Sequence, residues 1–262
     1  FKQEIKTVLK LQENNDGLIK IIDFNRKNNK NKYFAWYAME KATIFQVNYP
    51  ITLIEKLNKL IDLAKIIKSL HNVEGSTYYA HRDIKPSNIF IINDKIKLSD
   101  FGLVWCNEYD RLTGNGEKVG PAIILPPELE RVYLVNESKL DFRKSDIYLF
   151  GKVVWMYVMK NNTGFYGEYD RSNSNICLDK NTIINEYGNK SIATIEPLHL
   201  LLEGTTKNDP NDRINIETCI FYITEQINII NNSISQNKLQ EYKYLEVTKN
   251  FVATKKPQTM IY

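Results

Sequence analysis

The chain has few cysteines, no long apolar run and no excess of one charge sign. Its three cysteines, Cys106, Cys177 and Cys219, are far apart and form no Cys/His metal-binding pattern. This favours a reducing compartment over a disulfide-stabilised secreted protein. Residues 153–159, one of the longest apolar runs, are too few to cross a bilayer, and no signal-peptide pattern opens the sequence. We therefore expect a cytoplasmic protein.

Charged residues of both signs alternate along the chain. The 35 Lys and Arg and 31 Asp and Glu give a formal net charge of +4 without a basic block, so neither nucleic acid nor a membrane is an expected partner. The 43% hydrophobic fraction and the length of 262 residues suit a globular protein that buries a core, as one large domain or two lobes.

Hydrophobic spacing predicts a mixture of helices and short strands. Apolar residues at helical spacing predict helices over residues 1–12, 53–71, 145–159, about 193–203 and about 216–230. Ser145 is expected to cap the third of these. Strands are predicted over 18–25 and 32–40, and a hairpin with its turn at Asn93 and Asp94 is predicted over 89–98.

Residues 78–103, YYAHRDIKPSNIFIINDKIKLSDFGL, place charges between short apolar runs. One interpretation is a solvated hairpin. The other is a phosphoryl-transfer site, which needs a metal held against phosphates, a group that orients the acceptor hydroxyl, and positive charge. This stretch contains side chains of these types: Asp83, Lys85, Asn88 and Asp100. The carboxylate and amide oxygens among them suit Mg²⁺. Because Asn88 and Asp100 flank the hairpin, folding would bring them to the same end.

The order of these motifs resembles the protein kinase family. HRDIKPSN at 81–88 followed by DFG at 100–102 is similar to the family's catalytic and metal-binding loops. SDIYLFG at 145–151, PPELE at 126–130 and DPNDR at 209–213 follow in the family's order. The resemblance implies an α+β, kinase-like two-lobe fold. Its parts are a truncated N-terminal β lobe over 1–42, a mostly helical C-terminal lobe over 43–230, and a tail of unknown role over 231–262.

The resemblance also implies residue roles. Asp83 would orient the substrate hydroxyl and accept its proton, and Lys85, as in the serine/threonine-specific form, would neutralise the transferring phosphate. Asn88 and Asp100 would hold Mg²⁺. Other matched positions are structural: an apolar spine of Val8, Ile21, His81 and Phe101, a brace for the catalytic loop at Asp146, and a pair formed by Glu128 and Arg213.

Nucleotide-binding positions follow from the same resemblance. YAMEKA at 37–42 is similar to the hinge that binds adenine. Met39 would line the back of the adenine pocket, and backbone groups from Glu40 to Ala42 would hydrogen-bond to adenine. Phe90 would form the floor of this pocket. Glu4 matches the helix glutamate that pairs with a strand lysine.

The sequence departs from the family at two places. It contains no G-x-G-x-x-G motif, and Lys2 is too near Glu4 to serve as its partner. We expect the glycine-rich loop and the lysine to lie upstream of Phe1, and we predict very low or no kinase activity for these 262 residues. In addition, Gly120 is followed by Pro121 where the family commonly has threonine, which leaves the acceptor class open.

Arg82 precedes Asp83, an arrangement that in the family often pairs with a phosphorylated activation loop. The hydroxyl candidates between Leu103 and Pro127 are Tyr109 and Thr113. We hypothesise activation through a phosphate on Thr113; the alternative is an acidic residue such as Glu108, Asp110 or Glu117, because ordering the loop through Arg82 needs only an anion.

The leading interpretation is a Ser/Thr-type protein kinase domain that uses ATP and Mg²⁺ and acts on a protein substrate with a Ser/Thr acceptor. The main alternative is a non-catalytic kinase-like binding module (a pseudokinase), and a third is a small-molecule phosphotransferase. Asp83, Lys85, Asn88 and Asp100 are all retained, which favours an enzyme. Arg213 and the PPE segment favour the protein kinase branch.

Overall fold

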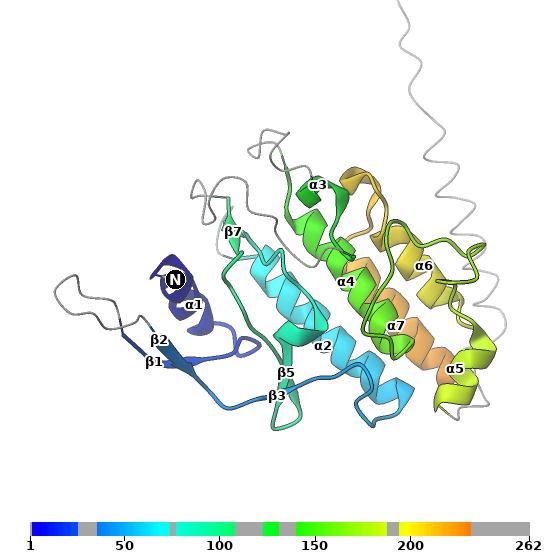
Figure 1. The fold of residues 1–262 in the computed structure, drawn as a ribbon, viewed down its shortest axis with the longest axis horizontal. Helices are drawn as coiled ribbons and strands as arrows, with labels where there is room; N and C mark the ends of the chain where they lie inside the picture. Colours follow the sequence, from blue (N-terminus) through cyan, green and yellow to red (C-terminus); the bar gives the residue numbers. More distant parts are fainter. Residues whose placement is uncertain are drawn as a thin grey trace, which may run out of the picture.

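A computed structural model describes residues 2–25, 36–73, 77–107, 123–130, 140–187 and 194–231. One helix and short strands form one end of the molecule, and packed helices form the larger remainder (Figure 1). The fold is α+β, as the sequence predicts. The boundaries 1–42, 43–230 and 231–262 stay predictions, and residues 232–262 lie outside the described part.

The smaller end combines a helix with a two-stranded antiparallel sheet. Its elements are α1 (Lys2–Gln12), β1 (Ile21–Asn25) and β2 (Trp36–Met39). α1 buries Ile5, Val8 and Leu11, which share one helical face. The strand predicted from residue 18 starts later because Leu18 instead forms a parallel bridge with Leu98. This bridge joins the small end to the central hairpin.

The predicted hairpin consists of β5 (Ile89–Ile92) and β6 (Lys95–Leu98). Both turn residues, Asn93 and Asp94, have positive φ, of 48° and 63°, as two-residue hairpin turns require. A third strand, β3 (Thr43–Ile44), pairs with β5, and β4 (Tyr79–Ala80) pairs with β7 (Trp105–Cys106). The short helix η1 (Pro86–Asn88) leads into β5.

Helices form the larger part of the molecule. They are α2 (Leu53–His71), α3 (Pro127–Glu130), α4 (Arg143–Val158), α5 (Lys180–Tyr187), α6 (Glu196–Thr205), η3 (Pro210–Asp212) and α7 (Ile216–Ile230). α2 and α7 have the predicted bounds. Thr52 and Glu55 form a capping box that fixes the start of α2. The prediction that Ser145 caps α4 is wrong, because this helix begins earlier, after Phe142.

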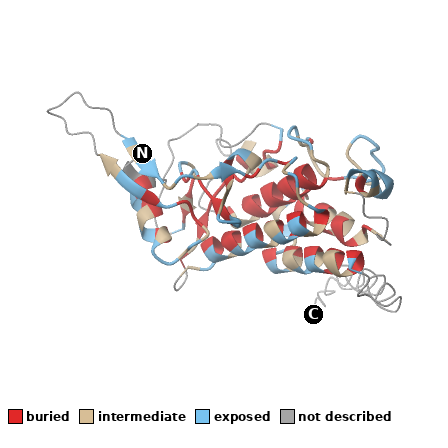
Figure 2. Cartoon of the chain, turned by 90° about the horizontal axis from the view of Figure 1, so that it is seen from below, coloured by how far each residue is buried: buried red, intermediate tan, exposed pale blue. Residues whose placement is uncertain are grey.

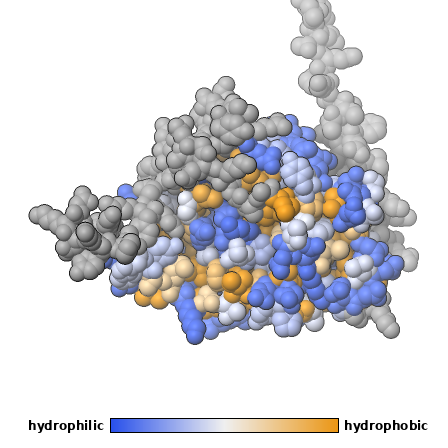
Figure 3. Space-filling view, in the orientation of Figure 1, coloured by the Kyte–Doolittle hydropathy of each residue, from blue (hydrophilic) through white to orange (hydrophobic). Residues whose placement is uncertain are grey.

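The core lies where α2, α4, α6 and α7 pack together. Figure 2 shows buried residues along the inner faces of the helices and exposed residues outside. α4 is buried on nearly all sides, as expected of a helix that is apolar around its circumference. In the face drawn in Figure 3, hydrophilic and hydrophobic residues interleave. No helix in the described ranges has the length and apolar character needed to cross a membrane.

Candidate active site

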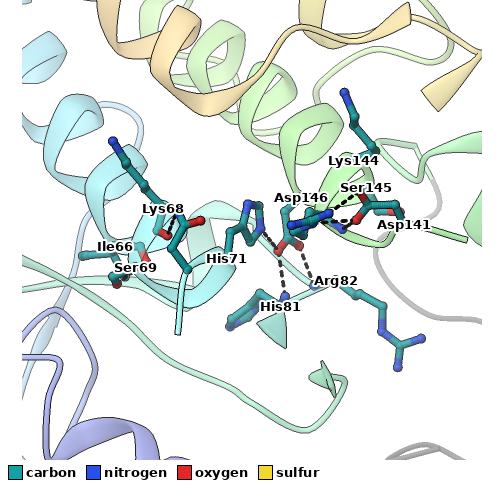
Figure 4. A network of polar contacts seen from close by, with 12 residues as sticks. Ile66, Lys68, Ser69, His71, His81, Arg82, Asp141, Lys144, Ser145 and Asp146 are labelled. Carbon is teal, nitrogen blue, oxygen red and sulfur yellow. Dashed lines mark hydrogen bonds and ion pairs between the residues drawn. The ribbon is translucent and has the colours of Figure 1, made fainter. Parts of the chain in front are cut away.

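Asp146, near the start of α4, holds residues 81–88 from beneath; this is the loop that the resemblance predicts to be catalytic, and it is called the catalytic loop below. Its Oδ1 accepts the backbone N–H of Arg82 at 2.7 Å, and its Oδ2 accepts that of His81 at 2.8 Å. The His71 Nε2 atom, at the end of α2, lies 2.9 Å from the same Oδ2 (Figure 4). The predicted bracing by Asp146 is therefore confirmed, and His71 is an additional partner that the sequence analysis missed.

Arg82 connects the catalytic loop to the stretch after the DFG motif. Its φ of 63° lies in the left-handed region that L-residues rarely adopt. Its Nε donates to the carbonyl oxygen of Leu103 at 2.7 Å, and its guanidinium lies 5.0 Å from the ring centroid of Phe142. The hypothesised phosphorylation site Thr113 lies outside the described residues.

The two carboxylate oxygens of Asp83 have different surroundings. Oδ2 accepts hydrogen bonds from Lys85 Nζ at 2.7 Å and from Asn88 Nδ2 at 3.0 Å. Oδ1 is buried and has no hydrogen-bond partner in the part of the chain that the structure describes. An unpartnered buried oxygen costs stability and calls for an explanation. Lys85 and Asn88 thus fix one oxygen, and the other is left without a hydrogen-bond partner among the described residues.

His81 is held as a neutral ring. Its Nδ1 accepts the backbone N–H of Asp83 at 3.3 Å, and its Nε2 lies 3.1 Å from the carbonyl oxygen of Ser99. Because a carbonyl oxygen only accepts, Nε2 carries the proton. Burial lowers the pKa of His81, and Phe101 contacts it edge-to-face at 5.0 Å. This environment supports the predicted structural role for His81.

Asn88 and Asp100 lie at the same end of the β5–β6 hairpin, as predicted. The backbone N–H of Ser99 donates to the carbonyl oxygen of Asn88 at 3.0 Å. Asp100 is exposed, has a φ of 65°, and accepts the N–H of Gly102 at 3.4 Å. Within the described ranges no cluster of three or more His, Cys, Asp or Glu could hold a metal. One amide and one carboxylate fit Mg²⁺, which takes its remaining ligands from phosphate and water.

Glu128 and Arg213 join three distant segments. Arg213 NH1 and NH2 donate to the Glu128 carboxylate at 2.6 and 2.8 Å. The Ser145 hydroxyl donates to Glu128 at 2.7 Å, and Arg213 also donates to the carbonyl oxygen of Lys144 at 2.8 Å. The predicted pair is confirmed, and it anchors α3 to the start of α4.

The family model described as "Protein kinase domain" matches residues 1–222. The chain belongs to this family. It is 30% identical over 158 residues to a probable serine/threonine-protein kinase of Clostridium acetobutylicum, covering 59% of this chain and 22% of that protein. It is also 30% identical over 154 residues to a putative serine/threonine-protein kinase of Acanthamoeba polyphaga mimivirus, covering 56% and 53%.

A further relative is the serine/threonine-protein kinase PknL of Mycobacterium tuberculosis. It is 30% identical over 175 residues, which are 64% of this chain and 40% of PknL. The matched part of this kinase domain therefore spans between about a fifth and about half of the length of these relatives.

The kinase domain has a small pocket between α1, the β1–β2 sheet and the DFG motif. Among its lining residues are Val8, Ile21, Met39, Asp100 and Phe101. The structure thus brings Met39, expected behind adenine, beside the aspartate expected to bind metal. Val8, Ile21 and Phe101, three members of the predicted apolar spine, meet in the same pocket.

The remaining positions that the sequence predicts to bind the nucleotide lie in four different places. The Glu40 backbone N–H donates to the carbonyl oxygen of Lys20 at 3.0 Å, which holds the predicted hinge against the residue before β1. Ala42 is half-buried between β2 and β3. Phe90, on β5, pairs with Ile44 of β3 and is not part of the lining of the Met39 pocket. Glu4 lies on α1, and its side chain falls outside the description.

Proposed function

We propose that this kinase domain transfers the γ-phosphate of ATP to a serine or threonine hydroxyl of a protein substrate. The arrangement around Asp83 carries the proposal, because Lys85 and Asn88 hold Oδ2 while the buried Oδ1 lacks a partner. A hydroxyl group at Oδ1 would be oriented and would pass its proton to Asp83. Lys85, 2.7 Å from Asp83, supplies positive charge at the same place.

Asn88 and Asp100 are the residues that would hold Mg²⁺. When bound, the ion supplies charge neutralisation for the phosphates. Asn88 suits this role because its Nδ2 already donates to Asp83, to the backbone oxygen at 2.9 Å and to Oδ2 at 3.0 Å. Its amide oxygen is thereby turned away from Asp83, and the Ser87 hydroxyl donates to it at 3.5 Å.

The 262 residues alone are proposed to catalyse this transfer slowly. Kinases of this class turn over at about 1–100 s⁻¹, and most of their catalysis is positioning and charge stabilisation of the phosphates. No G-x-G-x-x-G motif occurs among these residues to cover the phosphates. The same observation favours the alternative of a non-catalytic binding module, and binding of Mg·ATP separates the two.

A thermal-shift titration tests the proposal. Mg·ATP in large excess should raise the unfolding temperature by about 2–4 °C, because a ligand that binds the folded state stabilises it. Asp100→Asn should abolish most of the Mg²⁺-dependent part of the shift. Asparagine tolerates positive φ, so the backbone at this position is preserved.

Asp94→Asn is the matched control. Asp94 is also exposed with a φ of 63° and lies at the opposite end of the same hairpin. This variant should keep the full shift. The absence of any Mg·ATP shift in the unmodified chain, or an equal loss in both variants, would contradict an ATP- and Mg²⁺-using enzyme.

A cytoplasmic location is part of the proposal. It is supported by the three cysteines, Cys106, Cys177 and Cys219, all of which are free thiols.

A further inference from the structure

A cavity of about 460 Å³ lies directly beside the catalytic loop. Lys85 and Pro86 line it from the loop, Ile123 and Ile124 from the segment before α3, and Met156 from α4. None of these residues lines the pocket that contains Met39 and Asp100. The cavity is therefore separate from the nucleotide side of the site.

The lining is largely apolar, with one cation and three neutral polar residues, Ser87, Asn162 and Thr163. Lys85 is the single charged residue among the described lining residues, and no carboxylate is present. Ile123 is 45% exposed at the rim, a large apolar side chain open to solvent. A basic ligand side chain would place a second cation near Lys85 with no carboxylate in the described lining to compensate it, because the Asp83 carboxylate is already paired with Lys85. An apolar side chain would instead gain by leaving water.

The floor of the cavity is preformed. Ile124 and Met156 are 3% and 4% exposed. Gly164, with a φ of 74°, brings the loop after α4 so close that an added Cβ would lie 2.6 Å from Ile124 Cγ2. Only glycine combines this φ with this close approach. The shape of the floor is therefore fixed before any ligand binds.

The cavity lies close to Asp83, the residue that the phosphoacceptor hydroxyl is proposed to contact, because one residue, Lys85, adjoins both. Lys85 lines it, and Lys85 Nζ is 2.7 Å from Asp83 Oδ2. An extended peptide advances about 3.3 Å per residue. A peptide whose hydroxyl reaches Asp83 would therefore pass the cavity within about three residues of the acceptor.

We propose that this cavity binds a bulky apolar side chain of the protein substrate, such as leucine or phenylalanine, close to the phosphoacceptor, and disfavours arginine there. The inference rests on the proposed function in one respect only: it assumes that the phosphoacceptor hydroxyl of the substrate binds at Asp83. The substrate class is then a serine- or threonine-containing peptide with an apolar anchor, not a basic one.

Peptide binding, measured by fluorescence anisotropy, tests the proposal without turnover. The peptides have a central serine in an alanine background, with each flanking position replaced in turn by leucine, phenylalanine or arginine. At one fixed position leucine or phenylalanine should bind at least about tenfold more tightly than alanine, and arginine should bind no better than alanine.

Ile123→Glu is the diagnostic variant, because Ile123 is exposed and its replacement leaves the core intact. It should abolish the apolar preference and create one for arginine at the same position. Phe221→Glu is the matched control, since Phe221 is also 45% exposed but lines a different cavity on α7. It should leave the preference unchanged.

A flat profile at all positions, or an apolar preference that survives Ile123→Glu, would overturn the proposal. So would an equal effect of both variants. One further outcome is that peptides bind with the expected preference and yet receive no phosphate. That result would support the proposed side-chain site in the cavity and contradict the proposed phosphoryl transfer, so a failure of one proposal can be told from a failure of the other.

Discussion

Arg82 adopts a φ of 63°, a conformation that costs a non-glycine residue of order 1–3 kcal/mol. Asp146 offsets this cost by accepting the N–H groups of Arg82 and His81 together. The neutral ring of His81 then accepts the N–H of Asp83. The position of Asp83 thus depends on Asp146, which is far away in the sequence.

Gly151 is the contact point between α4 and α6. A Cβ added there would lie 2.0 Å from Thr205 Oγ1 and 2.7 Å from Thr205 Cβ. We predict that Gly151→Ala lowers the free energy of unfolding by about 1–3 kcal/mol through overpacking. Urea denaturation measures this change.

Thr205→Ala provides the control for this prediction. It removes the atoms that the new methyl group would meet, so Gly151→Ala should be less destabilising in its presence than alone. Strictly additive effects of the two substitutions would show that the clash with Thr205 is not the cause.

Sequence motifs indicated the residues of the candidate site itself more readily than the residues that hold them in place. Asp83, Lys85 and Asn88 follow one another closely, so their motif is visible in the sequence and the structure brings the three together. His71 and Ser99 were missed, although His71 contacts Asp146, which holds the catalytic loop, and the carbonyl oxygen of Ser99 contacts His81 in that loop. Their contacts depend on how α2 and β6 pack against the loop, and no local pattern encodes that packing.

At the scale of elements, α4 carries an ionisable group inside its buried face. Lys152 has no exposed surface, and its ammonium lies 3.4 Å from the ring centroid of Phe165. It donates to the carbonyl oxygens of Phe165, at 2.9 Å, and Gly167. Burial lowers the pKa of Lys152 from its ordinary 10.5 to about 6, although the carbonyls and the ring offset part of this effect.

This lysine should make stability depend on pH. Between pH 6 and 10.5 the unfolded chain binds the proton that folded Lys152 releases, so the free energy of unfolding rises with pH in this range. Lys152→Met should flatten this rise and increase the free energy of unfolding at pH 7 by about 1–3 kcal/mol.

Urea denaturation at pH 7 and at pH 9 measures both effects. Lys160→Met, at a half-buried position just after α4 whose lysine pairs with Glu186, is the control and should keep the pH dependence of the unmodified chain. Parallel pH dependences for Lys152→Met and the unmodified chain would contradict the assignment.

Long elements were predictable from the sequence and short ones were not. α2 and α7 have enough turns for the 3.6-residue period to show. β3, β4 and β7 have two residues each, too few for any alternation, and they form only because β5 and the surrounding chain provide partners. α4 begins two residues before the predicted Ser145, whose hydroxyl binds Glu128 instead of capping the helix.

At the scale of the whole molecule, α4 links the parts of the kinase domain. Asp146 near its start holds the catalytic loop, and the neighbouring Ser145 contacts the Glu128–Arg213 pair. Met156 near its end lines the cavity proposed for the substrate. The features proposed for the acceptor and for the substrate therefore share one helix.

The sequence elements that would hold the ATP phosphates differ in this respect from the residues around Asp83. The 262 residues contain no G-x-G-x-x-G motif, while the acceptor side retains Asp83, Lys85 and Asn88 in mutual contact. We therefore predict that the 262 residues transfer phosphate from ATP to a serine or threonine hydroxyl, but at a low rate.

The most direct test measures the transfer of radiolabelled phosphate from ATP to a serine-containing peptide. The assay compares the purified chain with its Asp83→Asn variant. The unfolding temperatures of the two proteins are compared to check that both are folded. We predict slow, Mg²⁺-dependent transfer by the unmodified chain and a reduction of about 10²–10⁴-fold in the variant. Equal transfer by both proteins, or transfer by the unmodified chain at the ordinary rates of about 1–100 s⁻¹, would contradict the account. No transfer by the unmodified chain would contradict the proposed slow catalysis and favour the non-catalytic binding module.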